Sequence, residues 1–279
     1  MTAGEWGRLA ASRLIAADAI DAEADADWLL CEALGAGRGA LARLDRVQLG
    51  ERESASLAGW LARRESGEPL QYVLGYVEFM GIRFKCDGRA LIPRMDTEAL
   101  CEKAIAFLAE RGGSRSALDL CAGGGAIGLA VKRALPSISV VLSDVDPRAI
   151  SLARENAESL RLDAEFAVGD LFLPVAGRRF DAVLCNPPYV RSGDMASLPR
   201  EVLAEPAIAL DGGRDGMDFY RRVADGLPDF LAPSGAAFLE VGDGLADDVA
   251  RMMGRVGEVS IYSDLSGARR VVAVYSGGG

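Results

Sequence analysis

The four residues Asn186-Pro187-Pro188-Tyr189 combine a stiff backbone with groups that can hold a planar amine. They follow Phe180 to Cys185, an apolar run short enough for one buried strand. Two consecutive prolines cannot continue a central strand, and each proline fixes its own φ. We therefore expect a rigid corner at the carboxyl end of a strand, which is where open α/β sheets bind ligands.

The polar atoms of this corner suit the two N–H bonds of one –NH2 group. A proline carbonyl and the side-chain oxygen of Asn186 can only accept hydrogen bonds, and Tyr189 offers a flat face for stacking. The nitrogen of a carboxamide or a base amine is a weak nucleophile because its lone pair is delocalised, so catalysis depends mainly on holding it beside an electrophile. The structural alternative is a Pro-Pro turn with a capping Asn. The buried strand before the motif and the glycine loop upstream favour the functional interpretation.

A second candidate site is the glycine-rich turn Cys121-Ala122-Gly123-Gly124-Gly125, between the apolar run that contains Asp119 and a helical segment. Glycine lets a ligand approach the backbone closely, but such a turn alone also occurs in dinucleotide enzymes. Asp144 and Asp170 end the next two predicted strands, where one carboxylate can accept two ribose hydroxyls and the other can reach an adenine amine. Taken singly, Asp144 and Asp170 are explained equally well by ligand binding and by helix capping or loop solvation. Their succession at strand ends favours ligand binding.

Composition excludes several classes of protein. The chain has 279 residues, a net charge of −10 and no histidine, so Ser-His-Asp hydrolysis is excluded. The five cysteines form no C-x-x-C pair, which argues against a zinc site or a disulfide framework and fits a reducing cytoplasm. We find no apolar stretch typical of a membrane span or a signal peptide. An acidic chain is also a poor nucleic-acid clamp, although a local basic patch stays possible.

Periodicity predicts an α/β protein with a helical N-terminal domain over residues 1–71, a β-hairpin linker over 72–92 and an α/β domain over 93–279. The tryptophans all lie in the first domain, and we expect them to pack between helices rather than to form a docking surface. The expected strands centre on Leu118, Val141, Phe166, Val183, Phe238, Ile261 and Val272. The last two are joined by too few residues for a crossover helix, so we expect them to be antiparallel.

A helix is expected directly after the linker. Asp96 and Thr97 precede its apolar face and are predicted to cap it, while Gly112 and Gly113 are predicted to end it. The three glycines that end the sequence are expected to be disordered.

The turn at Cys121 to Gly125 resembles the first motif of S-adenosylmethionine-dependent methyltransferases. That resemblance implies S-adenosylmethionine as cofactor, with Asp119 serving its amino-acid end directly or through water. A sulfonium methyl group is already electrophilic, so this chemistry needs positioning and neither an acid nor a strong base. A chain without histidine loses nothing by it.

Longer motifs make the chain similar to the protein-(glutamine-N5) methyltransferases of peptide chain release factors (the PrmC/HemK family). The matching segments are 68–75, Glu78-Phe79, 91–94 with Thr97-Glu98, 186–190, Glu205-Pro206, 212–216, 219–221 and 264–267. The resemblance implies a Rossmann-like seven-stranded S-adenosylmethionine-dependent methyltransferase domain behind a helical substrate-docking domain. It also implies that Asn186 and Pro187 hold the glutamine amide of a release factor's Gly-Gly-Gln loop. Pro188 and Tyr189 complete that pocket. Cys121 to Gly125, Asp144, Leu171 and Asn186 match cofactor-binding positions.

Three positions depart from the family pattern. Cys121 stands where the family commonly has glycine, and a left-handed backbone there would be strained by a side chain. Leu171 stands where an aromatic residue often covers the adenine, and Met95 replaces a common proline.

Three alternative functions stay open. They are a ribosomal-protein glutamine methyltransferase, a nucleic-acid amino-methyltransferase that acts on a flipped base, and a protein that binds the cofactor without methylating anything. We expect a cytoplasmic monomer whose partner is a release factor, with no direct contact to membrane or nucleic acid.

Overall fold

The computed structural model of the chain describes residues 1–111 and 115–277. The predicted helix end at Gly112 and Gly113, and the last two residues of the predicted disordered tail, lie outside these ranges. The described chain forms two compact units. One unit contains Met1–Tyr76 and Leu198–Ala204, and the other contains Val77–Ser197 and Glu205–Gly279. Every helix in the described ranges is too short or too polar to cross a membrane.

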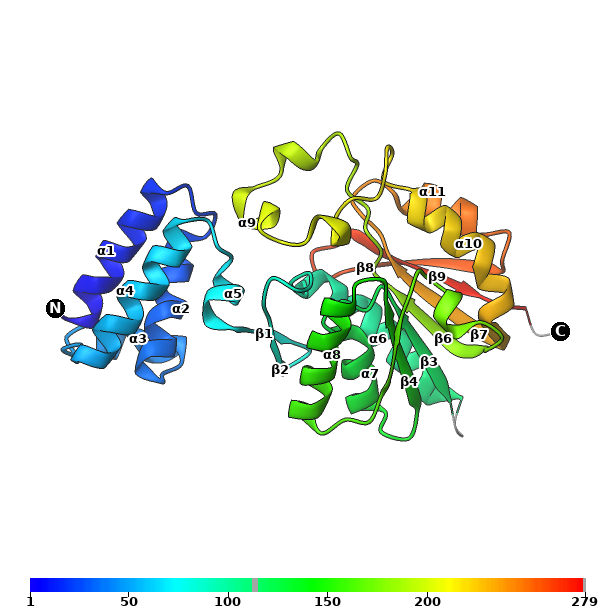
Figure 1. Cartoon of the computed structure of the whole chain (residues 1–279), viewed down its shortest axis with the longest axis horizontal. Helices are drawn as coiled ribbons and strands as arrows, with labels where there is room; N and C mark the ends of the chain where they lie inside the picture. Colours follow the sequence, from blue (N-terminus) through cyan, green and yellow to red (C-terminus); the bar gives the residue numbers. More distant parts are fainter. Residues whose placement is uncertain (112–114, 278–279) are drawn as a thin grey trace. The chain divides into compact units, whose positions relative to one another are not determined.

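The first unit is helical (Figure 1). Its helices are α1 (Ala3–Ala16), α2 (Ala22–Leu34), η1 (Arg38–Ala40), α3 (Leu41–Leu44), α4 (Glu51–Glu65), α5 (Leu70–Leu74) and α9 (Arg200–Leu203). The tryptophan prediction holds for Trp6, which is buried, and for Trp60, which packs against the core. It is wrong for Trp28, which is 37% exposed and lies under the guanidinium of Arg38 at 5.6 Å from the ring centroid.

A buried ion pair holds this unit together. Arg64 on α4 is 1% exposed, and its Nη2 lies 2.5 Å from Asp25 Oδ2 on α2 and 2.7 Å from Glu201 Oε1 on α9. Because a buried guanidinium is costly without partners, these two carboxylates fix the places of α2 and α9 against α4.

The second unit begins with a two-stranded hairpin, as predicted. Strands β1 (Tyr76–Phe79) and β2 (Ile82–Lys85) are joined by Met80 and Gly81. Both turn residues have positive φ, 52° and 68°, which is the backbone that a two-residue hairpin turn requires.

The main sheet contains the seven predicted strands. They are β3 (Ser116–Leu120), β4 (Ser139–Asp144), β5 (Glu165–Val168), β6 (Phe180–Cys185), β7 (Leu231–Glu240), β8 (Glu258–Ser263) and β9 (Arg269–Tyr275). Their order is β5-β4-β3-β6-β7-β9-β8, and β9 pairs antiparallel with both β7 and β8, which confirms the predicted antiparallel pair. Strands β3 to β7 are parallel, so their carboxyl ends share one edge of the sheet.

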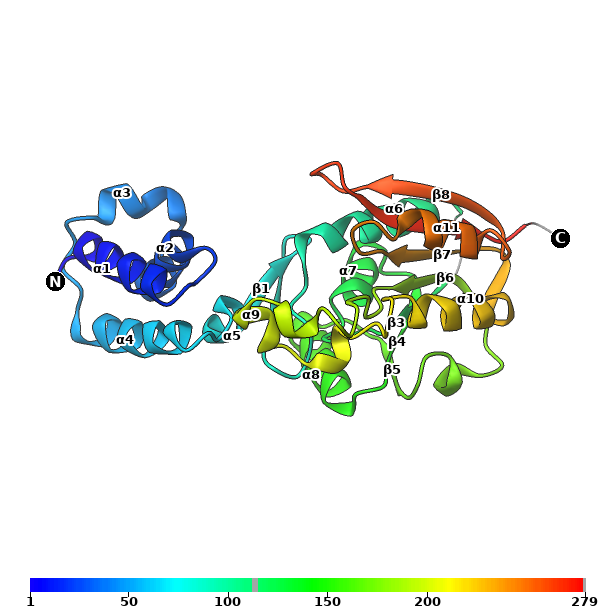
Figure 2. The same cartoon turned by 90° about the horizontal axis from the view of Figure 1, so that it is seen from above.

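Helices cover both faces of this sheet (Figures 1 and 2). They are α6 (Glu98–Glu110), α7 (Ala126–Ala134), α8 (Pro147–Leu160), α10 (Asp218–Phe230) and α11 (Ala246–Met253), with short turns η2 (Met95–Thr97), η3 (Leu173–Val175), η4 (Met195–Ser197) and η5 (Ala207–Ala209). Tyr220 of α10 and Val249 of α11 pack in one core with Val183 and Leu239 of the sheet. Phe107 of α6 packs against Phe238, whose side chain points to the opposite face.

The predicted caps of α6 are wrong. Thr97 occupies the N-cap position but makes no side-chain cap hydrogen bond, and Asp96 lies within η2. Thr97 is instead buried, and its hydroxyl accepts a hydrogen bond from Asn186 Nδ2 at 3.4 Å. A pattern of capping residues cannot reveal a tertiary partner 89 residues away.

Candidate active site

The second unit has a cleft at the carboxyl edge of its parallel strands. It is lined by Arg89, Ala90, Leu91, Cys121, Gly123, Ser143, Asp144, Val145, Asp146, Ala149, Gly169, Asp170, Leu171, Asn186, Pro188, Pro206, Ile208, Ala209 and Phe219. The two regions singled out in the sequence, the glycine loop and the Asn-Pro-Pro corner, therefore border one cavity.

The glycine loop turns sharply between β3 and α7. Its residues Cys121, Gly123 and Gly125 have φ values of 59°, 54° and 83°. Glycine is required at position 125, because a Cβ there would lie 2.6 Å from Leu142 Cδ2. The left-handed backbone expected at Cys121 is present, so a side chain stands where it is sterically unfavourable. Cys121 and Gly123 line the cleft, whereas Ala122, Gly124 and Gly125 do not.

Asp119 anchors α7, the helix that follows this loop. Its side chain is fully buried, and Oδ2 accepts a hydrogen bond from Gly128 N at 2.8 Å, while Oδ1 has no protein partner among the described residues. Burial raises the pKa of this carboxyl to about 7. Asp119 does not line the cleft.

Asp144 ends β4 and faces the cleft. Its Oδ2 accepts from Gly123 N at 2.8 Å and its Oδ1 accepts from Asp146 N at 2.9 Å, so the carboxylate ties the glycine loop to the start of α8. Burial raises its pKa, whereas these backbone hydrogen bonds lower it. Each oxygen keeps a second lone pair for a ligand hydroxyl.

The residues after β5 also reach the cleft. Leu171 lines it in a left-handed backbone, with φ of 46°. Asp170 lines it too, but its Oδ2 is paired with Arg222 Nη2 at 2.5 Å. A ligand amine would therefore share that carboxylate with an arginine of α10.

The Asn-Pro-Pro-Tyr motif begins directly after β6. Asn186 and Pro188 line the cleft, and Pro187 is buried beside them. Tyr189 does not line the cleft. A Cβ on Gly242 would lie 2.8 Å from the Tyr189 ring, and the hydroxyl lies 3.4 Å from Glu240 Oε1. Burial raises the pKa of Tyr189. The stacking face expected from this residue is thus turned away from the cavity.

The backbone of this motif packs closely against two glycines to which the sequence analysis assigned no role. A Cβ on Gly212 would lie 2.6 Å from Tyr189 Cα and 2.8 Å from the Pro188 carbonyl oxygen, and one on Gly216 would lie 2.4 Å from the Tyr189 carbonyl oxygen. Gly212 N also donates to Val190 O at 2.7 Å. The glycine-rich spacing of residues 212–216 was the signal that could have revealed this support.

Another part of the cleft wall comes from segments that the sequence analysis did not place in the site. Glu205 joins them, because its Oε2 accepts from Ile92 N at 2.8 Å and its Oε1 pairs with Arg94. Burial raises the pKa of this carboxyl. Its hydrogen bonds hold the cleft residues Leu91 and Pro206 near each other. The Ile-Pro-Arg and Glu-Pro pairs are motifs in the sequence, but their contact is visible only in the fold.

Comparisons with known proteins agree over both units. The PrmC N-terminal domain matches residues 5–75, and the methyltransferase small domain matches residues 99–213. The release factor glutamine methyltransferase of Geobacter sulfurreducens is 40% identical over 256 residues, covering 90% of this chain and 89% of that protein. Its counterpart in Deinococcus radiodurans is 35% identical over 271 residues, covering 97% of each chain. A methyltransferase from Pyrococcus furiosus shares the fold, with a TM-score of 0.52 at 18% identity over 71% of this chain and 90% of that one.

Proposed function

The chain belongs to the family of release factor glutamine methyltransferases, and we propose that it transfers a methyl group from S-adenosylmethionine to a glutamine of a peptide chain release factor. The acceptor is the N5 nitrogen of the glutamine in the Gly-Gly-Gln loop. The main support is that Asn186 and Pro188 border the same cleft as Cys121, Gly123 and Asp144. An amide held at this Asn-Pro-Pro corner would lie next to a cofactor held by the second group.

The cleft residues suit S-adenosylmethionine. Asp144 retains lone pairs for ribose hydroxyls, and Val145, Leu171 and Ile208 supply apolar surface for a base. Gly123 has no side chain to keep a ligand away from the backbone. When bound, this cofactor supplies a methyl group that is already electrophilic.

The residues of the chain then have one main task, which is to orient the amide. The carboxamide oxygen of Asn186 accepts one N–H of the substrate, and the carbonyl of Pro187 accepts the other. With both N–H bonds held, the nitrogen cannot rotate away from the methyl donor. The high effective concentration of the amide then compensates for its weak nucleophilicity. In the transfer the methyl–sulfur bond of the cofactor would break and leave a neutral thioether, while the amide nitrogen would gain the methyl carbon and lose one proton to solvent, so no basic side chain is required.

The test is a transfer assay with methyl-labelled S-adenosylmethionine and three acceptors: release factor, ribosomal protein and DNA. We expect label only on the release factor, on the peptide that contains Gly-Gly-Gln, as located by mass. Label on ribosomal protein or DNA would support the alternative substrates, and no label on any acceptor would support a cofactor-binding protein without activity.

Replacement of Asn186 by alanine tests the pocket itself. We expect kcat to fall by about 100-fold or more, since one of the two amide contacts is lost, with an unchanged melting temperature. Turnover equal to that of the wild type in the Asn186→Ala variant would refute the assignment.

A further inference from the structure

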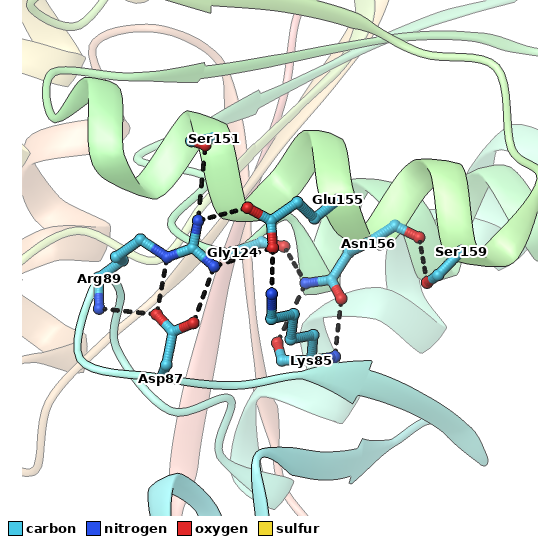
Figure 3. Close-up of polar contacts among 8 residues, drawn as sticks. All are labelled: Lys85, Asp87, Arg89, Gly124, Ser151, Glu155, Asn156 and Ser159. Atoms are coloured by element: carbon cyan, nitrogen blue, oxygen red, sulfur yellow. Dashed lines mark hydrogen bonds and ion pairs between the residues drawn. The ribbon is translucent and has the colours of Figure 1, made fainter.

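One buried amide joins three segments beside the cleft (Figure 3). Asn156 on α8 is 1% exposed. Its Oδ1 accepts from Lys85 N at 2.7 Å, and its Nδ2 donates to Lys85 O at 3.2 Å and to Gly124 O at 2.9 Å. The side chain therefore pairs with the last residue of the hairpin as a neighbouring strand would, and at the same time it holds the glycine loop.

Both of the joined segments lead directly into the cleft. Lys85 is followed by the turn that carries Arg89, Ala90 and Leu91 to one wall, and Gly124 follows the lining residue Gly123. Ala90 also packs against Ala149 and Leu152 of α8, so the apolar contact and the amide contact lie on one helix. A Cβ on Gly123 would lie 3.8 Å from the Ala90 Cβ, so the two segments are neighbours in the cleft wall and their relative position depends on how α8 holds each of them.

The neighbouring ion pairs are less able than Asn156 to fix the positions of the hairpin exit and the glycine loop. Glu155 pairs with Lys85 and with Arg89, and Arg89 pairs with Asp87. The Lys85 and Glu155 side chains are 53% and 36% exposed. Exposed pairs of this kind contribute little, because water and salt screen them. A buried amide whose oxygen and nitrogen both have hydrogen-bond partners is costly to disrupt, since each lost partner leaves a desolvated polar group.

We propose that Asn156 is a positioning residue that sets the width of the cofactor cleft by tying the glycine loop to the exit of the hairpin. This inference rests on the proposed function, since it takes the cleft to be the site of S-adenosylmethionine. Asn156 does not line the cavity and so acts only through Lys85 and Gly124. Its loss affects cofactor affinity more than turnover at saturation.

The most informative variant is Asn156→Asp. It keeps the size of the side chain and the oxygen that accepts from Lys85 N, but it replaces the Nδ2 donor by a second oxygen, which faces the carbonyls of Lys85 and Gly124. At pH 8 we expect the dissociation constant for S-adenosylmethionine, measured by calorimetry on the full chain, to rise about tenfold or more. With saturating cofactor, the KM for release factor and kcat stay within about threefold of the wild type. Asn156→Ala removes the contacts without adding a charge and supplies a second comparison. Glu158→Gln, two positions away on α8 and exposed, is the matched control and leaves the cofactor affinity nearly unchanged.

A pH series separates positioning from general damage to the fold. The new carboxyl regains a donor when it is protonated, so the ratio of variant to wild-type dissociation constants falls between pH 8 and pH 5.5. The charged groups around it are Lys85 on β2, Asp87 and Arg89 after it, and Glu155 on α8. Arg89 and Lys85 hold the pKa of Glu155 at about 2, and Arg89 lowers that of Asp87, so neither acid accounts for a change in this window.

Three outcomes would overturn the inference. They are wild-type cofactor affinity in both Asn156 variants, a weakened affinity in Asn156→Asp that ignores pH, or failure of both variants to fold, which would make Asn156 a residue of the fold rather than of the cleft. Failure of the proposed function has a different signature. In that case the wild-type chain itself binds no S-adenosylmethionine or methylates no release factor.

Discussion

A single methyl group at Gly212 is expected to disable the amide pocket without touching any ligand. Gly212 lies in the loop that supports the motif, and its backbone N–H donates to Val190 O at 2.7 Å. A Cβ added at this position would lie 2.6 Å from Tyr189 Cα, 2.8 Å from Pro188 O and 2.9 Å from Tyr189 C. All three atoms belong to backbone, so no side chain can rotate to relieve the contact.

The size of the effect follows from these distances. Carbon atoms pack best at about 3.5 Å or more, so the Gly212→Ala variant must separate the two backbones by roughly 1 Å. Overpacking of this kind costs about 1–3 kcal/mol of stability. A displacement of about 1 Å at the reacting groups lowers turnover by roughly 100-fold. The glycine loop, Asp144 and Leu171 belong to other segments of the cleft, so the affinity for S-adenosylmethionine should stay within about threefold.

The measurement combines kcat for release factor methylation, the dissociation constant for S-adenosylmethionine, and urea unfolding. Gly193→Ala is the matched control, because Gly193 is exposed and precedes Gly212 in the same connection, and a Cβ added there would meet no atom of the described chain within 4 Å. Wild-type kcat in Gly212→Ala would show that the loop does not determine where the Asn-Pro-Pro corner lies. An equal loss in Gly193→Ala would show that the loop is sensitive everywhere.

Two further predictions concern stability. Burial raises the pKa of Asp119 to about 7, so the folded state keeps a proton that the unfolded chain releases near pH 4. Stability conferred by this group therefore falls as pH rises from about 4 to 7, by about 2–3 kcal/mol between pH 5 and pH 8. The Asp119→Asn variant should lose that slope in urea titrations, and parallel pH profiles of variant and wild type would contradict the assigned pKa. Cys121 has a left-handed backbone with φ of 59°, so Cys121→Gly should gain about 0.5–1 kcal/mol in the free energy of unfolding, after the entropy of the unfolded glycine is subtracted. A net destabilisation in the same titrations would mean that thiol packing outweighs backbone strain.

The strands and the two site motifs were predictable because each depends on neighbours in the sequence. A short apolar run such as Phe180 to Cys185 predicts a buried strand, and two prolines predict its end. Glycines between a strand and a helix predict a close backbone approach. None of these inferences needs a distant partner, and the structure places all of the features in the same order.

The directions of individual side chains were less predictable, since they depend on residues far along the chain. Asp170 pairs with Arg222, 52 residues later, and Tyr189 turns toward Glu240, 51 residues later. Trp28 remains exposed because its helix already buries Leu29 and Leu30 on its other faces. Local periodicity identifies which positions are apolar but does not identify the partner of a polar group.

The orientation of the Asn186 amide shows what such a distant partner contributes. Nδ2 of Asn186 donates to the Thr97 hydroxyl, which leaves Oδ1 as the free acceptor of that carboxamide. Burial raises the pKa of the Glu240 carboxyl, and the Thr97 hydroxyl lowers it. A pocket for an –NH2 group needs an oxygen facing outward, and Thr97, 89 residues earlier in the chain, is the partner that occupies the opposite end of the Asn186 carboxamide.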